Sequence, residues 1–382
     1  SINRSANALL GIPSGSGIQR YIVACGGVTL NPAARNACTA ASRLSPNMAT
    51  LAGAKSPQLS RAATPAARRE VDRIADIGAE WICLVCTVMQ ETVHSTVQFR
   101  DFEYTPDDRE LAGIIGYIHS KGIRVMLRPM IECRDGLQRS HIDFPDDGQI
   151  IPGKPFHYWR DWFASYRALT RHYCRLADQT GCEAYCFDSE LDRTVRRNAE
   201  WLGIVEEARK QFRGTLTASL IYVPQFTAAL KANPNHWFFS LDTLGSSLYP
   251  PAADGPGATL EMMMERLRPV AAEHAAFCKL YPKPVYFGEI GCCSAAGAAA
   301  KPWYWEYGSY DGMEQANYLR AALNVFEPED WFHGLFYWKW DEQNDRPTMR
   351  NDPAGDKGFT IYGKPAADVF RNWIPEERTV LA

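Results

Sequence analysis

The first 69 residues of this chain contain no aspartate or glutamate, although they carry eight arginine and lysine residues. The first acidic residue among the 382 is Glu70. Because the whole chain has a formal charge of −3 and residues 1–69 supply +8, residues 70–382 carry −11. An acid-free stretch rich in arginine, alanine and serine is typical of a targeting peptide and equally of a long surface extension. Composition alone leaves both interpretations open.

Three further features are scarce or missing, and each disfavours a class of protein. No apolar run reaches the roughly 18 residues of a membrane-spanning helix, so we expect no membrane partner. The small net charge gives no support for nucleic acid as a partner. No glycine-rich phosphate loop follows the first predicted strand, which disfavours a dinucleotide-binding domain. The remaining composition, 46% hydrophobic and 22% charged, is that of a globular protein.

Eleven cysteines leave at least one thiol unpaired within a monomer, because the number is odd. Four lie within or beside apolar runs, where reduced core thiols are expected: Cys83, Cys86, Cys182 and Cys186. Cys25 and Cys38 flank an irregular stretch and form a candidate disulfide. The Cys83-x-x-Cys86 spacing resembles half a zinc site, but no second pair has suitable spacing. We therefore predict no metal site and no cofactor.

From residue 64 onward, predicted helices and strands alternate. Thr64-Pro65 opens an amphipathic helix that ends at Gly78, and the apolar run 81–87 follows as a strand buried on both faces. The other predicted strands are 21–24, 123–127, 184–187, 216–221, 238–244, 284–287 and 334–338. The later predicted helices are 105–121, 159–179, 196–212, 225–232, 259–279, 312–325 and 364–373. Eight strands alternating with helices favour an α/β fold of the (β/α)8 TIM-barrel type over an open sheet.

The chain is predicted to be one barrel domain over residues 1–382. Residues 1–15 form an N-terminal extension in this prediction, and residues 26–63 form a long irregular insertion after strand one. Strand one and the start of the first helix both fall within the acid-free stretch. Most of that stretch therefore belongs to the predicted fold, and the insertion would emerge at the carboxyl ends of the strands.

Active sites of such barrels lie at the carboxyl ends of the strands. Glu190 and Glu289 follow strands four and seven, which lie opposite each other across the barrel mouth. Two carboxyls facing each other over a cleft suit glycoside hydrolysis. Taken singly, each glutamate is equally interpreted as a salt-bridge partner, and Asp188 competes with Glu190 on the same face of its strand. Arg128, at the end of strand three, either binds substrate or holds a carboxylate ionised.

Aromatic residues follow the last two strands, where sugar rings could stack on them. They are Trp303 and Trp305 after strand seven, and Trp338 and Trp340 at strand eight. A second aromatic group has helical spacing: Trp159, Trp162, Phe163 and Tyr166. This spacing predicts a buried helix face and not a sugar platform.

Several segments, in fixed order over some 300 residues, carry a resemblance to a known family. They are residues 78–90, 105–129, 187–191, 241–250, 283–303, 334–340 and 363–366. Among them are Phe187-Asp-Ser-Glu-Leu191 and Lys283-Pro-Val-Tyr-Phe-Gly-Glu-Ile-Gly291. In these segments the chain resembles glycoside hydrolase family 113, which consists of retaining barrel β-mannanases.

The resemblance implies a role for individual residues. Glu190 matches the acid/base and Glu289 the nucleophile, and Tyr249 falls where a tyrosine often lies near the nucleophile. Trp338 or Trp340 falls where a tryptophan floors the −1 sugar subsite. The full set of predicted substrate-binding residues is Gln90, Arg128, Asp188, Ser189, Tyr249, Trp303, Trp305, Trp338 and Trp340.

Three positions depart from the family pattern. Ser189 stands where asparagine is common, Arg128-Pro129-Met130 replaces Lys-Pro-His, and Met89 replaces an aromatic residue. Each change touches the part of the site that reads the sugar, so the sugar specificity stays open.

We predict a retaining hydrolase of β-linked glycans, with an oligo- or polysaccharide as its partner, acting as a monomer or simple homo-oligomer. β-Mannan and manno-oligosaccharides are the first candidate substrates, because the family resemblance implies them. Rival hypotheses are a β-glucosidase, β-galactosidase or β-hexosaminidase, and a non-catalytic glycan-binding barrel. A third is a hydrolase of another bond that uses a metal held by Asp188, Glu190 and histidine residues.

Overall fold

The computed structural model of the chain describes residues 19–25, 65–102, 104–304, 308–340 and 355–373. Side chains are described throughout these ranges except at 19–25, 149–151, 188 and 189. The predicted extension 1–15, the predicted insertion 26–63 and Cys38 lie outside the described residues. The single-domain organisation stays a prediction.

Within the described ranges, eight parallel strands form a closed sheet. In chain order they are β1 (Gln19–Cys25), β2 (Trp81–Gln90), β4 (Arg124–Cys133), β7 (Ala184–Ser189), β8 (Thr215–Ile221), β9 (Leu244–Leu248), β10 (Val285–Ile290) and β11 (Phe332–Trp340). Each pairs with its neighbours in parallel, and β1 pairs with both β2 and β11. This second pairing closes the sheet, so the predicted (β/α)8 barrel is confirmed.

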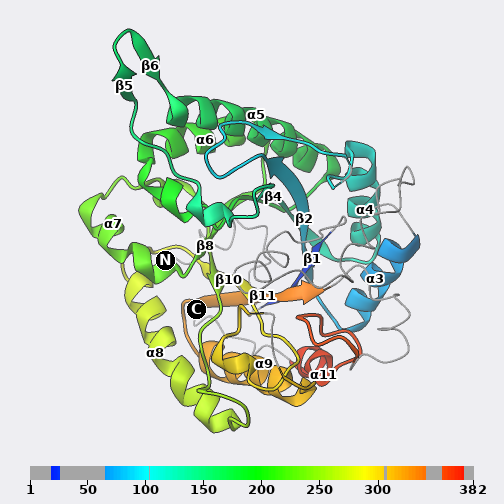
Figure 1. Cartoon of the computed structure of the whole chain (residues 1–382). Helices are drawn as coiled ribbons and strands as arrows, with labels where there is room; N and C mark the ends of the chain where they lie inside the picture. The colour runs from blue at the N-terminus through cyan, green and yellow to red at the C-terminus, as the bar shows by residue number, and fades with distance from the viewer. Residues whose placement is uncertain (1–18, 26–64, 103, 305–307, 341–354, 374–382) are drawn as a thin grey trace, which may run out of the picture.

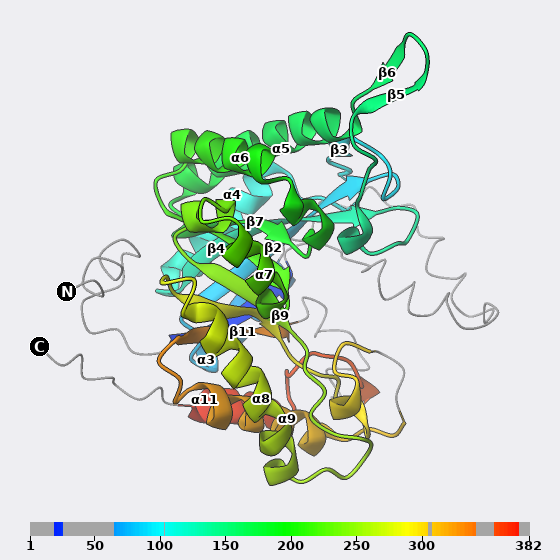
Figure 2. The ribbon, with the colours of Figure 1, turned by 90° about the vertical axis from the view of Figure 1, so that its left-hand side faces the viewer.

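Helices surround the barrel (Figure 1). They are α3 (Pro65–Asp76), α4 (Asp108–Ser120), α5 (Tyr158–Thr180), α6 (Asn198–Gln211), α7 (Thr227–Ala232), α8 (Leu260–Cys278), α9 (Gly312–Phe326) and α11 (Pro365–Asn372). In the described part of the chain, none of them is both long and apolar enough to cross a membrane. The short strand β3 (Gln98–Phe99) pairs antiparallel with β2. The hairpin β5 (Gly148–Ile151) and β6 (Lys154–Phe156) projects from the body between β4 and α5 (Figure 2).

The ends of the helices follow local sequence signals. At α4, the Asp107 side chain accepts from the Glu110 N–H and the Glu110 side chain accepts from the Asp107 N–H, which forms a capping box. Helix α5 ends at Gly181, whose φ of +74° lies in the left-handed region where a Cβ is costly. These signals explain why most predicted boundaries lie within a few residues of the observed ones.

The predicted sixth strand, residues 238–244, is wrong. Residues Trp237–Ser240 form the 3₁₀ helix η6, and the strand is the later segment Leu244–Leu248. Its sequence, Leu-Gly-Ser-Ser-Leu, has no apolar run because small residues are needed where it lines the barrel. A Cβ on Gly245 would lie 2.8 Å from the Tyr286 ring, and the Ser247 hydroxyl bonds to that of Ser219 at 3.0 Å.

Other sequence predictions about the core are confirmed. Cys83, Cys86, Cys182 and Cys186 are buried and not disulfide-bonded, and the same holds for Cys292 and Cys293. The aromatic face of α5 is buried, with its four predicted members between 0% and 3% exposed. Trp162 and Tyr166 stack with ring centroids 5.0 Å apart, so this face holds the helix against the barrel.

Gly288 is expected to tolerate no side chain, because a Cβ there would lie 2.0 Å from the Ser219 hydroxyl oxygen. We expect Gly288→Ala to lower the free energy of unfolding by about 2–3 kcal/mol through overpacking, measured by urea denaturation. Gly116→Ala is the matched control, because no atom lies within 4 Å of its added Cβ in α4. That control should stabilise by up to about 1 kcal/mol. Equal stability of Gly288→Ala and the wild type would contradict the packing argument.

Candidate active site

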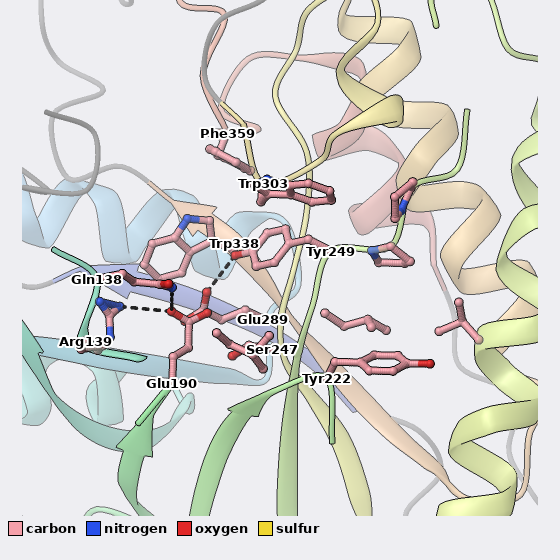
Figure 3. A pocket seen from close by; sticks show the side chains of 15 residues that line it. Gln138, Arg139, Glu190, Tyr222, Ser247, Tyr249, Glu289, Trp303, Trp338 and Phe359 are labelled. Carbon is pink, nitrogen blue, oxygen red and sulfur yellow. Dashed lines mark hydrogen bonds and ion pairs between the residues drawn. The ribbon is translucent and has the colours of Figure 1, made fainter. Parts of the chain in front are cut away.

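A pocket of about 600 Å³ opens at the carboxyl ends of the barrel strands (Figure 3). Five of the predicted site residues line it: Glu190, Tyr249, Glu289, Trp303 and Trp338. Glu190 comes directly after β7 and Glu289 lies within β10, the fourth and seventh strands of the barrel. The barrel thus brings together two carboxyls that are 99 positions apart in the sequence.

Both oxygens of the Glu289 carboxyl are engaged by donors. Arg128 Nη2 lies 2.8 Å from Oε1, and the Tyr249 hydroxyl donates to Oε2 at 2.8 Å. Burial raises the pKa of Glu289; the Arg128 guanidinium opposes this rise and the charge of Glu190 adds to it. Two fixed donors therefore orient the carboxyl and favour its ionised form inside the barrel.

The two donors to Glu289, Arg128 and Tyr249, each have a defined role. Arg128 lies in β4 with 1% of its surface exposed and does not line the pocket. Of the two hypotheses for this residue, the contact matches charge pairing with a carboxylate. Burial and the charge of Glu289 hold the pKa of the Tyr249 phenol well above its ordinary value. Tyr249 therefore stays protonated and acts as a hydrogen-bond donor.

Glu190 is held in an unusual backbone conformation. Its φ is +63°, a left-handed value that costs free energy for a residue with a side chain. The Glu190 N–H donates to the Ser219 carbonyl at 2.9 Å, which anchors it beside β8. Backbone strain of this kind concentrates at functional sites, and here it turns the carboxyl into the pocket (Figure 3).

Two neighbours of Glu190 were not predicted from the sequence. Gln138 Nε2 donates to Glu190 Oε2 at 3.0 Å, and Arg139 Nη2 lies 3.7 Å from the same oxygen. Ser140 Oγ donates to Gln138 Oε1 at 2.7 Å, which turns the amide nitrogen toward the carboxyl. Arg139 also pairs with Glu132 at 3.2 Å and is only 6% exposed. This pair of donors holds one oxygen of Glu190.

A further acidic neighbour of Glu190 is Asp192. Burial and the charge of Glu190 raise the pKa of Asp192 to about 7. Its Oδ1 accepts from Gln225 Nε2 at 2.9 Å. The predicted competitor, Asp188, lies in β7 together with Ser189, and their side chains are outside the described part.

The comparison with protein families bears on this geometry. The model for Glycoside Hydrolase Family 113 matches residues 56–364. The chain belongs to glycoside hydrolase family 113. It is therefore a glycoside hydrolase, and the resemblance found in its sequence is confirmed. No curated protein matches the chain.

Solved structures share the fold, and the first two described here are from family 113. A β-1,4-mannanase of the family is 29% identical with a TM-score of 0.67, over 81% of this chain and 92% of that chain. The β-mannanase from Alicyclobacillus acidocaldarius, in complex with ManMIm, is 24% identical with a TM-score of 0.72, over 93% of this chain and 96% of that one. The exo-β-1,4-mannosidase from Opitutaceae bacterium strain TAV5 is 13% identical with a TM-score of 0.51, over 94% of this chain and 61% of that one.

Several predicted site residues of this family 113 chain lie away from the pocket. The Gln90 amide is buried and accepts from Trp162 Nε1 at 3.0 Å and from Gln98 Nε2 at 2.9 Å. Trp340 is buried and donates to Glu70 at 2.8 Å. These hydrogen bonds join strand β2 to helix α5 and strand β11 to helix α3. Trp305 lies outside the described residues.

No group of three or more histidine, cysteine, aspartate or glutamate side chains is placed to hold a metal ion within the described ranges. Cys83 and Cys86, the half-site spacing noted in the sequence, both lie in β2.

Proposed function

We propose that this family 113 chain hydrolyses β-glycosidic bonds with retention of anomeric configuration, and that β-mannosides are its first candidate substrates. The observation that carries the proposal is the pair of glutamates from the fourth and seventh barrel strands lining one pocket. Their unequal surroundings support two roles. Glu289 has both oxygens engaged, as suits a nucleophile, while Glu190 has one oxygen held and the other available.

In the first step, a carboxylate oxygen of Glu289 attacks the anomeric carbon and the bond to the leaving oxygen breaks. Glu190 gives its proton to that oxygen, so the departing group leaves as a neutral alcohol. The product is an ester between the sugar and Glu289. The positive charge that develops on the ring is stabilised by the Glu289 carboxylate below it.

In the second step, water attacks the anomeric carbon of that ester. Glu190, now ionised, accepts a proton from the water, and Glu289 departs as a carboxylate. Two inversions give net retention, and both glutamates return to their starting states. The first step needs Glu289 to be deprotonated before it attacks, and its two donors favour that ionised form.

The preference for mannose rests on the family. The relatives at 29% identity are named β-1,4-mannanases, and this supports β-mannan and manno-oligosaccharides as the first candidates. The β-glucoside, β-galactoside and β-hexosaminide hypotheses remain rivals, since Ser189 and Met130 depart from the family pattern.

The test is a panel of aryl β-glycosides together with mannan, with the anomeric product followed by proton NMR. The proposal expects turnover of the β-mannoside with the β-anomer released first. Release of the α-anomer would overturn the mechanism. Turnover of another sugar with no rate on mannosides would overturn the specificity and keep the mechanism.

Replacing Arg128 with methionine is expected to move the acidic limb of the kcat/KM profile to higher pH by about one to two units. Loss of a cation 2.8 Å from Glu289 raises the pKa of this carboxyl further. Ionised Glu289 is then lost at higher pH as the solution is acidified. Arg128→Lys keeps the charge and should restore most of the limb.

Arg124→Met is the control for this experiment, because Arg124 is the first residue of β4 and lies over the Trp81 ring, away from the pocket. Its profile should match that of the wild type. An unchanged acidic limb in Arg128→Met would show that this ion pair does not govern the ionisation of Glu289.

A further inference from the structure

One face of β4 carries a row of buried side chains. Arg128, Met130 and Glu132 alternate along the strand, and this alternation places them on the same face. All three are buried. Arg128 reaches Glu289, whereas Met130 and Glu132 both contact the guanidinium of Arg139. The same strand therefore contributes to the surroundings of both pocket glutamates.

Arg139 lies between two carboxyls. It is the first residue of the 3₁₀ helix η3 (Arg139–His141), in the connection after β4. Its Nη1 donates to Glu132 Oε1 at 3.2 Å. Its Nη2 contacts the uncharged sulfur of Met130 at 2.8 Å and lies 3.7 Å from Glu190 Oε2 (Figure 3). One buried cation is thus shared by two acids.

The charges of this cluster do not balance if every acid is ionised. Arg128 and Arg139 supply two positive charges, while Glu132, Glu190 and Glu289 supply three negative ones. A buried charge without a partner costs a large free energy. With Glu289 paired to Arg128 and Glu132 paired to Arg139, the cluster is neutral when Glu190 holds a proton. This is the state in which Glu190 can act as an acid.

Glu132 depends on Arg139 for its charge. Burial raises the pKa of Glu132, the Arg139 guanidinium opposes this rise, and the charge of Glu190 adds to it. Ionised Glu132 and ionised Glu190 therefore disfavour each other, and the same guanidinium favours both. The two acids compete for one cation.

Other titratable groups also face these acids. Burial and the charge of Glu289 hold the pKa of Tyr249 well above its ordinary value, and burial raises the pKa of the Cys133 thiol to about 12. Asp192, from the 3₁₀ helix η4 (Asp192–Arg196), has a pKa raised to about 7 by burial and by the charge of Glu190. We expect Asp192 to contribute equally to every variant compared below, because none of them changes it.

We propose that Glu132 is a positioning residue for the reaction, which holds Arg139 and thereby keeps the proton on Glu190 for the first step. The inference rests on the proposed function, in which Glu190 is the acid/base. Once Glu190 has given its proton to the leaving oxygen, Arg139 and Gln138 both face the oxygen that carries the new charge. In the second step Glu190 accepts a proton from water, and the cluster is neutral again.

The test is the basic limb of the kcat/KM profile for an alkyl β-glycoside, which reports loss of the proton from Glu190. Glu132→Gln keeps an acceptor for Arg139 but removes the negative charge, so the guanidinium acts on Glu190 alone. Glu190 then loses its proton more readily, and the limb should move to lower pH by about one unit. At a pH above the limb, kcat/KM should fall about tenfold.

Arg139→Met should move the same limb in the opposite direction, by at least about half a unit, because Glu190 loses the cation that favours its ionised form. Glu132 also loses its partner in this variant and takes up a proton. Adding Glu132→Gln to Arg139→Met should therefore leave the limb where Arg139→Met places it. Such a non-additive result identifies Arg139 as the link between the two acids.

Two control variants separate charge from packing. Glu207→Gln removes the charge of another glutamate that pairs with an arginine, on α6 and away from the pocket. Met130→Leu changes a side chain packed against Arg139 without changing any charge. The basic limb should keep its wild-type position in both. A dinitrophenyl β-glycoside is the control within each variant, because its first step needs no proton from Glu190.

The outcomes distinguish this inference from the proposed function. A basic limb at the wild-type position in Glu132→Gln or in Arg139→Met overturns the role of Glu132 and leaves the proposed function standing. Either variant alone decides this if the other does not fold, because each has its own expected direction. Additive shifts in the double variant, or an equal shift with the dinitrophenyl substrate, also overturn the role. Failure of the wild type to turn over any β-glycoside overturns the proposed function and this inference with it.

Discussion

Replacing Glu289 with alanine is expected to reduce kcat for any β-glycoside substrate by at least about 10⁴-fold. The proposed reaction forms a covalent bond to this carboxylate, so its removal eliminates the attacking group. The same substitution leaves the Arg128 guanidinium buried without the carboxylate that it faces at 2.8 Å, which also costs stability. Glu289→Gln keeps the shape and the Tyr249 contact, and should be equally inactive.

Added azide gives this experiment a decisive product. In Glu289→Ala, azide enters the space left by the carboxylate and attacks the anomeric carbon of an activated aryl β-glycoside in one displacement. The product should be the α-glycosyl azide, identified by NMR. A β-glycosyl azide would mean that the two glutamates have been assigned the wrong way round.

Glu207→Ala is the matched control for Glu289. Glu207 also pairs with an arginine, with Arg171 Nε at 2.8 Å, but this pair lies nearer the surface because the Arg171 side chain is 47% exposed. Glu207 lies on α6, away from the pocket. Its removal should leave kcat at the wild-type level. Wild-type activity in Glu289→Ala would end the proposal that Glu289 is the nucleophile.

Replacing Glu190 with alanine should have a second large effect that depends on the leaving group. For an alkyl β-glycoside, we expect kcat/KM to fall by about 10³–10⁴-fold, because the alkoxide would depart without a proton. For a dinitrophenyl β-glycoside, the leaving group needs no proton, and the first step should fall by less than about tenfold. Rates on the two substrates measure the difference directly.

The second step provides an independent test of Glu190. Without its base, the sugar ester on Glu289 should accumulate as a burst with the dinitrophenyl substrate, and azide should release it as the β-glycosyl azide. Equal losses on alkyl and dinitrophenyl substrates would contradict the acid/base role. In that case the effect would have to be explained by changed packing around Gln138 and Arg139.

The barrel could be predicted from sequence because its signals are local. Apolar periodicity, capping residues and helix-ending glycines such as Gly181 act within one or two turns of chain. Strand six escaped prediction for the opposite reason. Gly245 and Ser247 have no strand-like run, and their suitability for the barrel comes from Tyr286 and Ser219, which lie far away in the sequence.

The candidate site likewise has one part that the sequence predicted and another that it did not. Alternation of strands and helices was enough to place Glu190 and Glu289 at the same end of the barrel, because parallel strands all finish on one side. The partners of those carboxyls were decided by tertiary structure. The sequence left two roles open for Arg128, substrate binding and charge pairing with a carboxylate. Its contact with Glu289 depends on which way β4 faces inside the barrel.

Gln138 and Arg139 show the limit most clearly, since they lie in the connection after β4, where no periodicity predicts direction. Gln90 is the opposite case, a predicted site residue that does not line the pocket. Trp162 and Gln98 both donate hydrogen bonds to its amide oxygen, so this polar residue at a strand end serves packing. Sequence by itself determined most of the elements, their order and the end of the barrel at which polar residues collect. Only the tertiary structure decided which of these residues meet, because hydrogen bonds and close packing act over a few ångströms in space, whatever the separation along the chain.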